Sequence, residues 1–299
     1  MNLISSEQLS KDQINKIMDI ADAIKSNKEE IAIKEHSILA LFFEEPSTRT
    51  RVSFEVAMAQ LGGHAIYLDA QETQAKRGEA IEDTSKVISG YCDFIAARMR
   101  RHRDLIRFAE NSTVPVINAL TDLEHPTQAL ADIYTIKEYK NGLKGVKIAF
   151  VGDIAANTAN SLMLTASKLG ADISLIGPRE FLPNMVYFNK AREYGRVKIF
   201  NSIEEGMEDA DIIYTDTFVS MGKEGEAEER EKLFAPYQVN EAMLEYAKPD
   251  AMVMHCLPAH RGKEITANII DGPRSIVFRQ ARNKLLINKA ILLYISQRE

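Results

Sequence analysis

Phe42-Phe43-Glu44-Glu45-Pro46-Ser47-Thr48-Arg49-Thr50-Arg51 joins a buried apolar run to the start of a helix. Residues 37–43 form the apolar run, whose length is typical of a strand that is covered on both faces. Residues 48–61 carry apolar side chains at helical spacing, and Gly62-Gly63 ends the pattern. A strand that leads through a short polar turn into a helix is the repeating unit of a parallel sheet, so we expect an α/β protein.

The polar turn of this stretch has the chemistry of an anion site. Ser47 or Thr48 fits the N-cap of the helix, whose first turn then carries backbone N–H groups without helical partners. A phosphate there would meet those donors and the positive end of the helix dipole, and Arg49 would add a charged, two-pronged donor. A simple helix cap flanked by surface arginines explains the same residues, so the turn alone leaves both interpretations open.

The rest of the chain repeats the alternation of short apolar runs with amphipathic stretches. Further strands are predicted at 65–68, 93–97, 114–119, 146–151, 172–176, 198–200, 212–215, 251–255 and 275–278. Helices are predicted at 79–89, 104–110, 127–139, 159–169 and 283–296. This order indicates two doubly wound parallel-sheet domains joined by long helices, with the active site in the cleft between them.

The composition excludes several classes of protein. The 299 residues are 45% hydrophobic, which is enough for two domains that each bury a core. The formal net charge of -6 argues against a general nucleic-acid surface. Two cysteines without metal-ligand spacing favour a reducing, cytoplasmic location. The N-terminal residues lack the features of a signal peptide, and no apolar run reaches the ~20 residues of a membrane span, so we expect no membrane partner.

Polar clusters follow the predicted strands at their carboxyl ends. These clusters are 47–50, 98–103, 125–128, 153–157, Asp216 and Cys256. The carboxyl ends of parallel strands meet at one edge of a sheet, where open parallel sheets bind their ligands. Loops are polar in general, but these are richer in Arg, His and Asn than the loops at the opposite ends. We therefore expect them to contribute to a binding site.

Arg98, His125 and Gln128 are the candidate site residues of two of these clusters. Arg98 comes first after its strand and is the best placed of the basic residues in 98–103. His125 and Gln128 lie one helical turn apart, so one helix face can present both. An imidazole N–H and an amide N–H aimed at one carbonyl oxygen would stabilise the negative charge that develops there. A histidine at a helix start is also a common capping residue, and the pair alone does not decide between these roles.

Cys256 and Asp216 are the candidate reactive groups of the second half. Cys256 fits a covalent nucleophile, a core thiol or a positioned polar group, and the sequence leaves these roles open. Its neighbour His255 would point to the opposite face of an extended strand, so we expect no Cys–His couple between them. Asp216 can pair with a substrate ammonium or simply belong to a turn.

Four segments resemble the signatures of the aspartate/ornithine transcarbamylase family. The segment from Phe42 to Glu55 resembles the carbamoyl-phosphate signature, and His125-Pro126-Thr127-Gln128-Ala129-Leu130-Ala131-Asp132 resembles a second signature. Asp216-Thr217-Phe218-Val219-Ser220-Met221-Gly222 and His255-Cys256-Leu257-Pro258 are similar to the ornithine branch. The motifs occur in the family's order along the whole chain, which makes the four together far more specific than any one of them.

The resemblance implies a carbamoyl-phosphate-binding domain, formed by residues 1–135 with the C-terminal helix 281–299, and an ornithine-binding domain at 136–280. The implied reaction transfers the carbamoyl group from carbamoyl phosphate to the δ-amine of L-ornithine and gives L-citrulline and phosphate. No metal and no organic cofactor is expected. The implied partners are the two substrates and further copies of the chain, in a homo-oligomer that is a trimer or a multiple of trimers.

The resemblance also implies residue roles. Carbamoyl phosphate would be bound by Ser47, Thr48, Arg49, Thr50, Gln74, Arg98, His125, Gln128, Cys256, Leu257 and Lys284. Ornithine would be bound by Asn157, Asp216, Ser220 and Met221. The catalytic groups would be Arg49, Arg98, His125, Gln128, Asp216 and Cys256. Either Cys256 or Asp216 would take the proton from the amine, and the family has a cis peptide bond at Leu257–Pro258.

Two positions depart from the family pattern. After Gly152-Asp153 many relatives read Gly-Asn-Asn, whereas this chain has Ile154-Ala155-Ala156-Asn157, so the role of Asn157 rests on an inexact match. Lys284 stands where the family usually has an arginine, and Arg282 is a second candidate for that role. Lysine keeps the charge but loses the two-pronged geometry of a guanidinium.

Other acceptors and other classes of protein are the alternatives. Aspartate, putrescine or N-acetylornithine would be the acceptor in a related transcarbamylase, but the aspartate enzymes usually read His-Pro-Leu-Pro-Arg where this chain has His255-Cys256-Leu257-Pro258. A dinucleotide-dependent oxidoreductase is disfavoured because Gly152 does not open a G-x-G-x-x-G fingerprint. A non-catalytic binding protein on this fold would be expected to lack Arg49 or Cys256.

Overall fold

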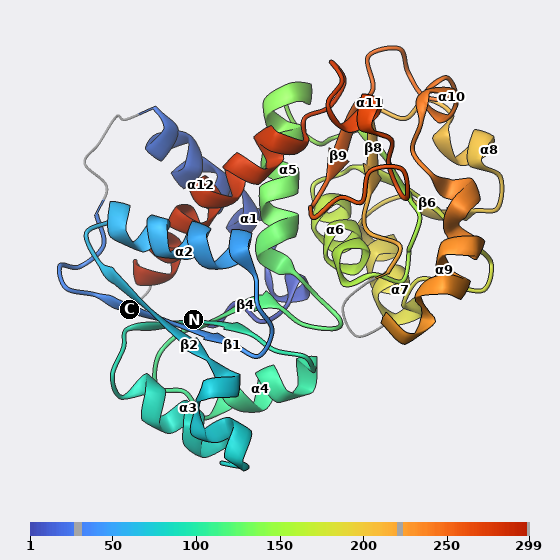
Figure 1. Ribbon diagram of the computed structural model, residues 1–299. Helices are drawn as coiled ribbons and strands as arrows, with labels where there is room; N and C mark the ends of the chain where they lie inside the picture. Colours follow the sequence, from blue (N-terminus) through green and yellow to red (C-terminus); the bar gives the residue numbers. More distant parts are fainter. Residues whose placement is uncertain (27–31, 220–223, 298–299) are drawn as a thin grey trace. The chain divides into compact units, whose positions relative to one another are not determined.

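The computed structural model describes residues 1–26, 32–219 and 224–297 (Figure 1). The chain folds into two units, one made of Met1–Ala131 with Arg282–Glu299 and the other of Asp132–Ala281. Each unit has its own parallel β-sheet with helices packed against it. The predicted α/β fold with two parallel sheets is therefore confirmed.

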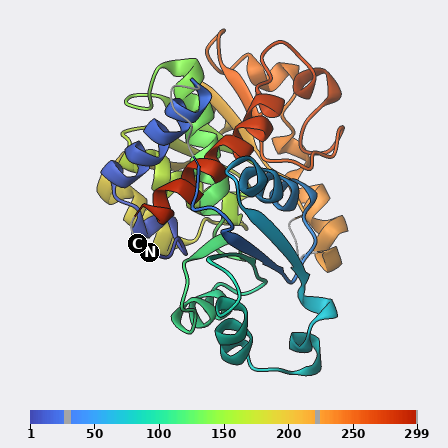
Figure 2. The same cartoon turned by 90° about the vertical axis from the view of Figure 1, so that its left-hand side faces the viewer.

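The first unit is built on a four-stranded sheet in the order β2-β1-β3-β4. The strands are β1 (Ile38–Phe43), β2 (His64–Asp69), β3 (Phe94–Arg98) and β4 (Val116–Leu120), and every pairing is parallel. The helices are α1 (Lys11–Lys25), α2 (Thr48–Gln60), α3 (Ile81–Ser89) and α4 (His102–Glu110), with the short turns η1 (Ser6–Gln8), η2 (Ala70–Glu72) and η3 (Gln74–Arg77). Figures 1 and 2 show α3 and α4 on one face of the sheet and α2 on the other.

The alternation of side chains along β1 supplies both faces of this sheet. Ala40 and Phe42 belong to the core under α3 and α4, where Phe42 stacks on Phe108 with ring centroids 5.4 Å apart. Phe43 points to the opposite face and meets Tyr67 edge-on at 5.6 Å between ring centroids. Because both faces are covered, β1 is an uninterrupted apolar run and not an alternating one.

The second unit is built on a five-stranded parallel sheet in the order β7-β6-β5-β8-β9. The strands are β5 (Lys147–Val151), β6 (Asp172–Ile176), β7 (Val197–Phe200), β8 (Ile212–Thr215) and β9 (Met252–His255). The helical segments are α6 (Asn157–Lys168), α7 (Met185–Tyr194), α8 (Ile203–Met207), η4 (Glu224–Glu226), α9 (Ala227–Phe234), η5 (Ala235–Tyr237), α10 (Glu241–Leu244) and α11 (Ala267–Ile270). Its core includes Val151, Ile176, Ile213 and Val253 from four neighbouring strands.

In both sheets the strand order reverses beside the first strand. β1 has β2 on one side and β3 on the other, and β5 has β6 on one side and β8 on the other. Loops that leave the carboxyl end of such strands diverge to opposite faces, which makes room for a ligand at the sheet edge. The loop after β1 carries Ser47 and the loop after β5 carries Asp153, so two of the predicted polar clusters lie at these reversal points.

Two long helices have residues in both units. α5 (Pro126–Lys140) begins in the first unit and ends in the second, and α12 (Val277–Ser296) runs from the second to the first. The predicted strand at 275–278 is wrong, because Ser275 forms a single bridge with Val253 and α12 begins two residues later. The apolar run at 276–278 is too short for its period to distinguish a strand from a helix. No helix in the described residues is both long and apolar enough to cross a membrane.

The sequence prediction also omits α1. Ser10 caps this helix by accepting a hydrogen bond from the Gln13 N–H at 3.2 Å, and the Gln13 side chain accepts from the Ser10 N–H at 2.8 Å. Ile14, Ile17 and Met18 then bury one face of the helix. This reciprocal cap is a start signal that the sequence does contain.

A buried ion pair connects α9 to two loops of the second unit. The Arg230 side chain is 1% exposed, and its Nη2 donates to Oδ2 of the fully buried Asp153. Its Nε donates to the backbone oxygen of Phe218 at 2.8 Å. The guanidinium also lies 4.5 Å from the ring centroid of Phe181 and 5.0 Å from that of Phe234. Because Asp153 follows β5 and Phe218 follows β8, Arg230 holds these two loops together.

Replacing Arg230 by methionine should destabilise the protein by about 3–5 kcal/mol, because Asp153 would remain buried without its partner. Urea unfolding followed by circular dichroism measures this change. The double variant Arg230→Met/Asp153→Asn lacks the unpaired charge and should recover part of the loss. A loss below about 1 kcal/mol in the single variant, the range of exposed pairs, would contradict the burial of this ion pair.

Candidate active site

The start of α2 presents the predicted anion-binding groups of the first unit. Ser47 is the N-cap residue in an extended conformation (φ -154°, ψ 105°), and its hydroxyl makes no capping hydrogen bond. Thr48 is exposed, Arg49 is half-buried and Thr50 is buried. The helix that follows has 13 residues, so its first turn carries the positive end of a full helix dipole. A hydroxyl that is not used by the helix cap and several backbone N–H groups are thus presented together.

Arg98 adds a second cation to this end of the sheet. It is the last residue of β3 and lies opposite Phe43, the last residue of β1. Burial lowers the pKa of Arg98 to about 10, the Glu45 carboxylate opposes this shift, and the charge of Arg49 adds to it. Arg98 stays protonated at neutral pH, and two guanidiniums close enough to repel each other favour an anion beside them.

Lys284 lies among the residues that were predicted to polarise a carbonyl group. Its side chain is 5% exposed. Its Nζ lies 3.0 Å from Oγ1 of Thr50, 3.0 Å from Oε1 of Gln128 and 3.3 Å from Nε2 of His125. Arg282, the other candidate for the family's arginine, has an exposed side chain. Of the two basic residues, Lys284 is therefore the one within this cluster.

His125 is held in its neutral form by these surroundings. Burial lowers the pKa of His125 well below its usual value, and the charges of Lys284, Arg98 and Arg49 lower it further. A neutral imidazole donates a hydrogen bond from one ring nitrogen and accepts at the other. The imidazole is therefore available as a polar, uncharged group at neutral pH.

In the second unit, the start of α6 holds Asp216 at the end of β8. Oδ2 of Asp216 accepts from the Thr158 hydroxyl at 2.7 Å, and Oδ1 accepts from the Thr217 N–H at 2.7 Å. The carboxylate is buried, with 6% of the residue exposed. Asn157 is the first residue of α6 and directly precedes Thr158. Residues 154–157 depart from the family pattern, but Asn157 still lies at the start of α6, next to Thr158, which contacts Asp216.

Cys256 lies close to both Asp216 and His255, with the sulfur, oxygen and nitrogen atoms of the three side chains within 4.8 Å of one another. The expectation that strand alternation separates His255 from Cys256 is wrong, because β9 ends at His255 and the alternation does not extend to Cys256. Nδ1 of His255 accepts from the Leu257 N–H at 2.8 Å, and Nε2 lies 3.1 Å from Oε1 of Glu264. Since both imidazole nitrogens have partners, His255 offers no open nitrogen to a metal ion or to the thiol.

A buried polar network fixes the end of β9, directly before Cys256. The side-chain oxygen of Gln280 accepts from the His255 N–H at 3.0 Å, and its amide donates to Oδ1 of Asp132 at 2.7 Å. The Tyr214 hydroxyl donates to Oδ2 of Asp132 at 2.9 Å. Burial raises the pKa of Tyr214 well above its usual value, and electrostatic interactions with Asp132, Cys256 and Asp216 raise it further. Tyr214 therefore stays a hydrogen-bond donor, as the network requires.

The remaining predicted positions are the Leu257–Pro258 peptide bond, Gln74, Ser220 and Met221. The Leu257–Pro258 peptide bond is cis, as the resemblance implies, and Leu257 has a positive φ of 60°. Gln74 lies in η3 with an exposed side chain. Ser220 and Met221, which were predicted to bind ornithine, lie outside the described residues.

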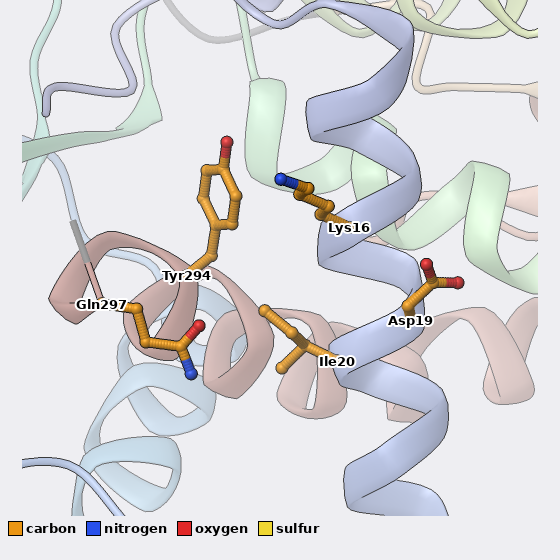
Figure 3. Close-up of a pocket in the computed structure, with 5 residues that line it drawn as sticks. All are labelled: Lys16, Asp19, Ile20, Tyr294 and Gln297. Atoms are coloured by element: carbon orange, nitrogen blue, oxygen red, sulfur yellow. The ribbon is translucent and has the colours of Figure 1, made fainter.

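Two of the cavities that the described residues line lie in different units. One, of about 450 Å³, lies beside α1 and α12 of the first unit, is lined by Lys16, Asp19, Ile20, Tyr294 and Gln297, and contains none of the predicted site residues (Figure 3). The other, of about 260 Å³, belongs to the second unit, where Thr217, Phe218 and His260 are among its lining residues. It therefore borders the loop that follows Asp216.

Two family models match the chain. Residues 1–138 match the carbamoyl-P binding domain of aspartate/ornithine carbamoyltransferase, and residues 144–295 match its Asp/Orn binding domain. The chain belongs to the aspartate/ornithine carbamoyltransferase family. The family and the enzyme class that the sequence motifs predicted are thereby confirmed.

Individual relatives carry the name of the ornithine branch. An anabolic ornithine carbamoyltransferase of Pyrococcus furiosus is 51% identical over 266 residues, which cover 87% of this chain and 84% of that protein. Ornithine carbamoyltransferase of Bacillus subtilis is 47% identical over 296 residues, or 97% of this chain and 92% of that protein. The solved structure of ornithine carbamoyltransferase from Pyrococcus furiosus superposes with a TM-score of 0.93 at 46% identity and covers 99% of this chain and 97% of its own.

Lowering the pH from about 7.5 to about 5.5 should destabilise the protein partly through His125. An unfolded histidine has a pKa of about 6.5, and folding lowers the pKa of His125, so the unfolded chain takes up the proton first. His125 makes its full contribution to the free energy of unfolding at pH values above the pKa of an unfolded histidine. Below that pKa the contribution falls, by up to about 1.4 kcal/mol per pH unit. Urea unfolding at the two pH values measures the loss.

The variant His125→Gln should lose about 1 kcal/mol less than the parent protein over this interval. His64, which is exposed on β2, supplies the matched control variant His64→Gln, which should keep the parent's pH dependence. If parent and His125→Gln lose stability equally, His125 is not held neutral by the fold.

Proposed function

We propose that the chain transfers the carbamoyl group of carbamoyl phosphate to the δ-amine of L-ornithine and releases L-citrulline and phosphate. The relatives described above are ornithine carbamoyltransferases and match this chain over most of its length. The observation that carries the choice of acceptor is Asp216, a buried carboxylate beside Cys256 in the second unit. A carboxylate there attracts a cationic amine and repels the second carboxylate of aspartate.

The first unit is the carbamoyl-phosphate-binding domain. The groups that bind the phosphate are Ser47, Thr48, Arg49, Thr50, Gln74 and Arg98. The backbone N–H groups at the start of α2 and the two arginines supply the positive field that a dianion needs. His125, Gln128 and Lys284 surround the carbonyl oxygen, where negative charge develops during the reaction.

The second unit is the ornithine-binding domain, with Asn157, Asp216, Ser220 and Met221 as the groups that hold the amino acid. An alkylammonium has a pKa near 10.4, so the δ-amine must lose a proton before it attacks. Asp216 and Cys256 are the two groups beside each other that can receive this proton, and Leu257 lines the same centre.

The reaction is a displacement at the carbonyl carbon. The amine lone pair forms the new C–N bond, and the C–O bond to phosphate breaks with the electron pair leaving on phosphate. Holding the amine and the carbonyl in reacting orientation contributes about 7–11 kcal/mol to the lowering of the barrier. Phosphate is a good leaving group, so this displacement requires no cofactor.

The proposal extends to the state of the protein in the cell. A homotrimer or a multiple of trimers follows from the family resemblance, with Gln74 near a subunit boundary. Cys92 and Cys256 form no disulfide, which fits a cytoplasmic location. The relative from Pyrococcus furiosus is described as anabolic, which supports a role in arginine biosynthesis.

A comparison of acceptors tests the reaction. The purified protein, incubated with carbamoyl phosphate and one acceptor at a time, should form a ureido product with L-ornithine and not with L-aspartate, putrescine or N-acetylornithine. A colorimetric assay for the ureido group detects all four products. Strong activity with aspartate and none with ornithine would overturn the proposed acceptor.

Arg49→Ala should reduce turnover by at least about 10²-fold while leaving the unfolding midpoint close to the parent value, because Arg49 is a half-buried phosphate ligand. The matched control is Arg51→Ala on the same helix. Nε of Arg51 donates a hydrogen bond to Oε1 of Glu55 at 2.9 Å, and Cζ of Arg51 lies 3.6 Å from the ring centroid of Tyr67. Because Arg51 is engaged by these two residues, its loss should leave most of the turnover. Equal activity of the two variants would remove Arg49 from the site.

A further inference from the structure

Residues 3–6, called here the edge segment, run beside the last strand of the first unit's sheet. Leu3 forms a parallel bridge with Ile117 of β4. The Leu3 N–H donates to the backbone oxygen of Val116 at 2.9 Å, and the backbone oxygen of Leu3 accepts from the Asn118 N–H at 2.8 Å. The edge segment therefore lies along the strand that leads to the start of α5.

The Asn118 side chain links the edge segment to the end of β4. Its Nδ2 donates to the backbone oxygen of Ile4 at 2.8 Å, and its Oδ1 accepts from the Leu120 N–H at 2.9 Å. Leu120 has a φ of 151°, in a range that favours glycine. A leucine keeps such a conformation only where its surroundings hold it, and the fully buried Asn118 belongs to those surroundings.

A second anchor lies on the turn that follows β4. The Ser5 hydroxyl donates to Oε1 of Glu124, and the Ser6 N–H donates to Oε2 at 2.7 Å. Glu124 is fully buried and Ser6 is 1% exposed, so water competes little for these positions. The Thr121 N–H donates to the backbone oxygen of Glu124 at 2.8 Å and closes the turn. The edge segment thus contacts the chain on both sides of this turn.

His125 lies where the turn meets α5. Its backbone oxygen accepts from the N–H groups of Gln128 at 3.0 Å and of Ala129 at 3.1 Å, so the helix holds one side of the residue. Glu124 directly precedes His125 and holds the other side. The following residue, Pro126, restricts the backbone of His125 further. A displacement of Glu124 is therefore passed on to the imidazole.

We propose that Glu124 is a positioning residue whose hydrogen bonds to the edge segment place the His125 imidazole for the reaction. The inference rests on the proposed function for its catalytic meaning. The edge segment acts through Glu124 and through Asn118, which together hold the turn between β4 and α5. A misplacement of about 1 Å at a group beside the reacting atoms can cost about 10²-fold in rate, so the anchoring of this turn matters for turnover.

Two variants of Glu124 separate the effect of its hydrogen bonds from that of its charge. Glu124→Leu removes the charge and both acceptor oxygens. Glu124→Gln also removes the charge, but its oxygen can accept from the Ser6 N–H and its NH₂ can donate to the Ser5 hydroxyl oxygen. Glu124→Leu should lower kcat by about 10–10²-fold, with the KM for ornithine within about twofold of the parent value. Glu124→Gln should restore most of kcat.

The imidazole can also be followed without substrate. ¹H–¹³C correlation spectra of the whole protein, labelled in the histidine rings, contain the His125 signals, which are those that disappear in His125→Gln. These signals should move in Glu124→Leu and stay close to the parent values in Glu124→Gln, with the exposed His64 as an internal reference. Unmoved His125 signals in Glu124→Leu would overturn the proposal. This result does not depend on the acceptor, so it separates failure of the inference from failure of the proposed function.

Ser5→Ala tests the same contact with a smaller change, should Glu124→Leu fail to fold. It removes one donor and leaves the carboxylate in place, so the His125 signals should move and kcat should fall by about 3–10-fold. Asn2→Ala is the matched control, because Oδ1 of Asn2 accepts from the Val116 N–H at 2.9 Å, on the same strand but before the turn. It should lower the unfolding midpoint and leave kcat and the His125 signals unchanged.

The comparison between variants decides the outcome. A loss of kcat in Glu124→Leu that Glu124→Gln recovers, together with moved His125 signals, supports the positioning role. Equal losses in Glu124→Leu and Glu124→Gln, or in Ser5→Ala and Asn2→Ala, would overturn it, because charge or stability alone would then explain the effect.

Discussion

A cation that is taken out of water must be surrounded by acceptors, and in the first unit that cation is Lys284. Its three short contacts explain why His125 has to be neutral, because a protonated imidazole would face an ammonium at 3.3 Å. One of these contacts also accounts for the burial of Thr50, whereas Thr48, two residues earlier, is exposed. A buried cation that contacts Thr50 and Gln128 attracts an anion, which fits the proposed binding of carbamoyl phosphate by the first unit.

In the second unit, the buried residue of the predicted site is acidic, whereas Lys284 in the first unit is basic. Asp216 is buried and accepts hydrogen bonds from a hydroxyl and a backbone N–H, and neither of these two donors carries a charge. The same loops are tied by Arg230, whose charge is matched by Asp153. Arg230 is thus paired with a carboxylate, whereas Asp216 accepts from two neutral donors, which suits its proposed role in binding a substrate amine.

The sequence predicted those features that depend on local pattern. The strand at 37–43 and the helix after Ser47 follow from an apolar run, a polar turn and helical spacing, and the structure has β1 and α2 there. It did not predict features that depend on contacts between distant segments. The roles of Gln280 and Asp132 arise from a network that links α12, α5 and β9, and no local signal reports it. The choice between Lys284 and Arg282 is of the same kind, since only the packing of α12 decides which of two basic residues is buried. The Ser10–Gln13 cap of α1, by contrast, was readable from the sequence.

The first unit takes its last helix from the far end of the chain, and this has a consequence for biosynthesis. Residues 1–131 leave the ribosome long before Lys284, with the whole second unit translated in between. Until then, Thr50, His125 and Gln128 lack their contacts with Lys284. The first unit can therefore complete its packing only after the second unit has been translated.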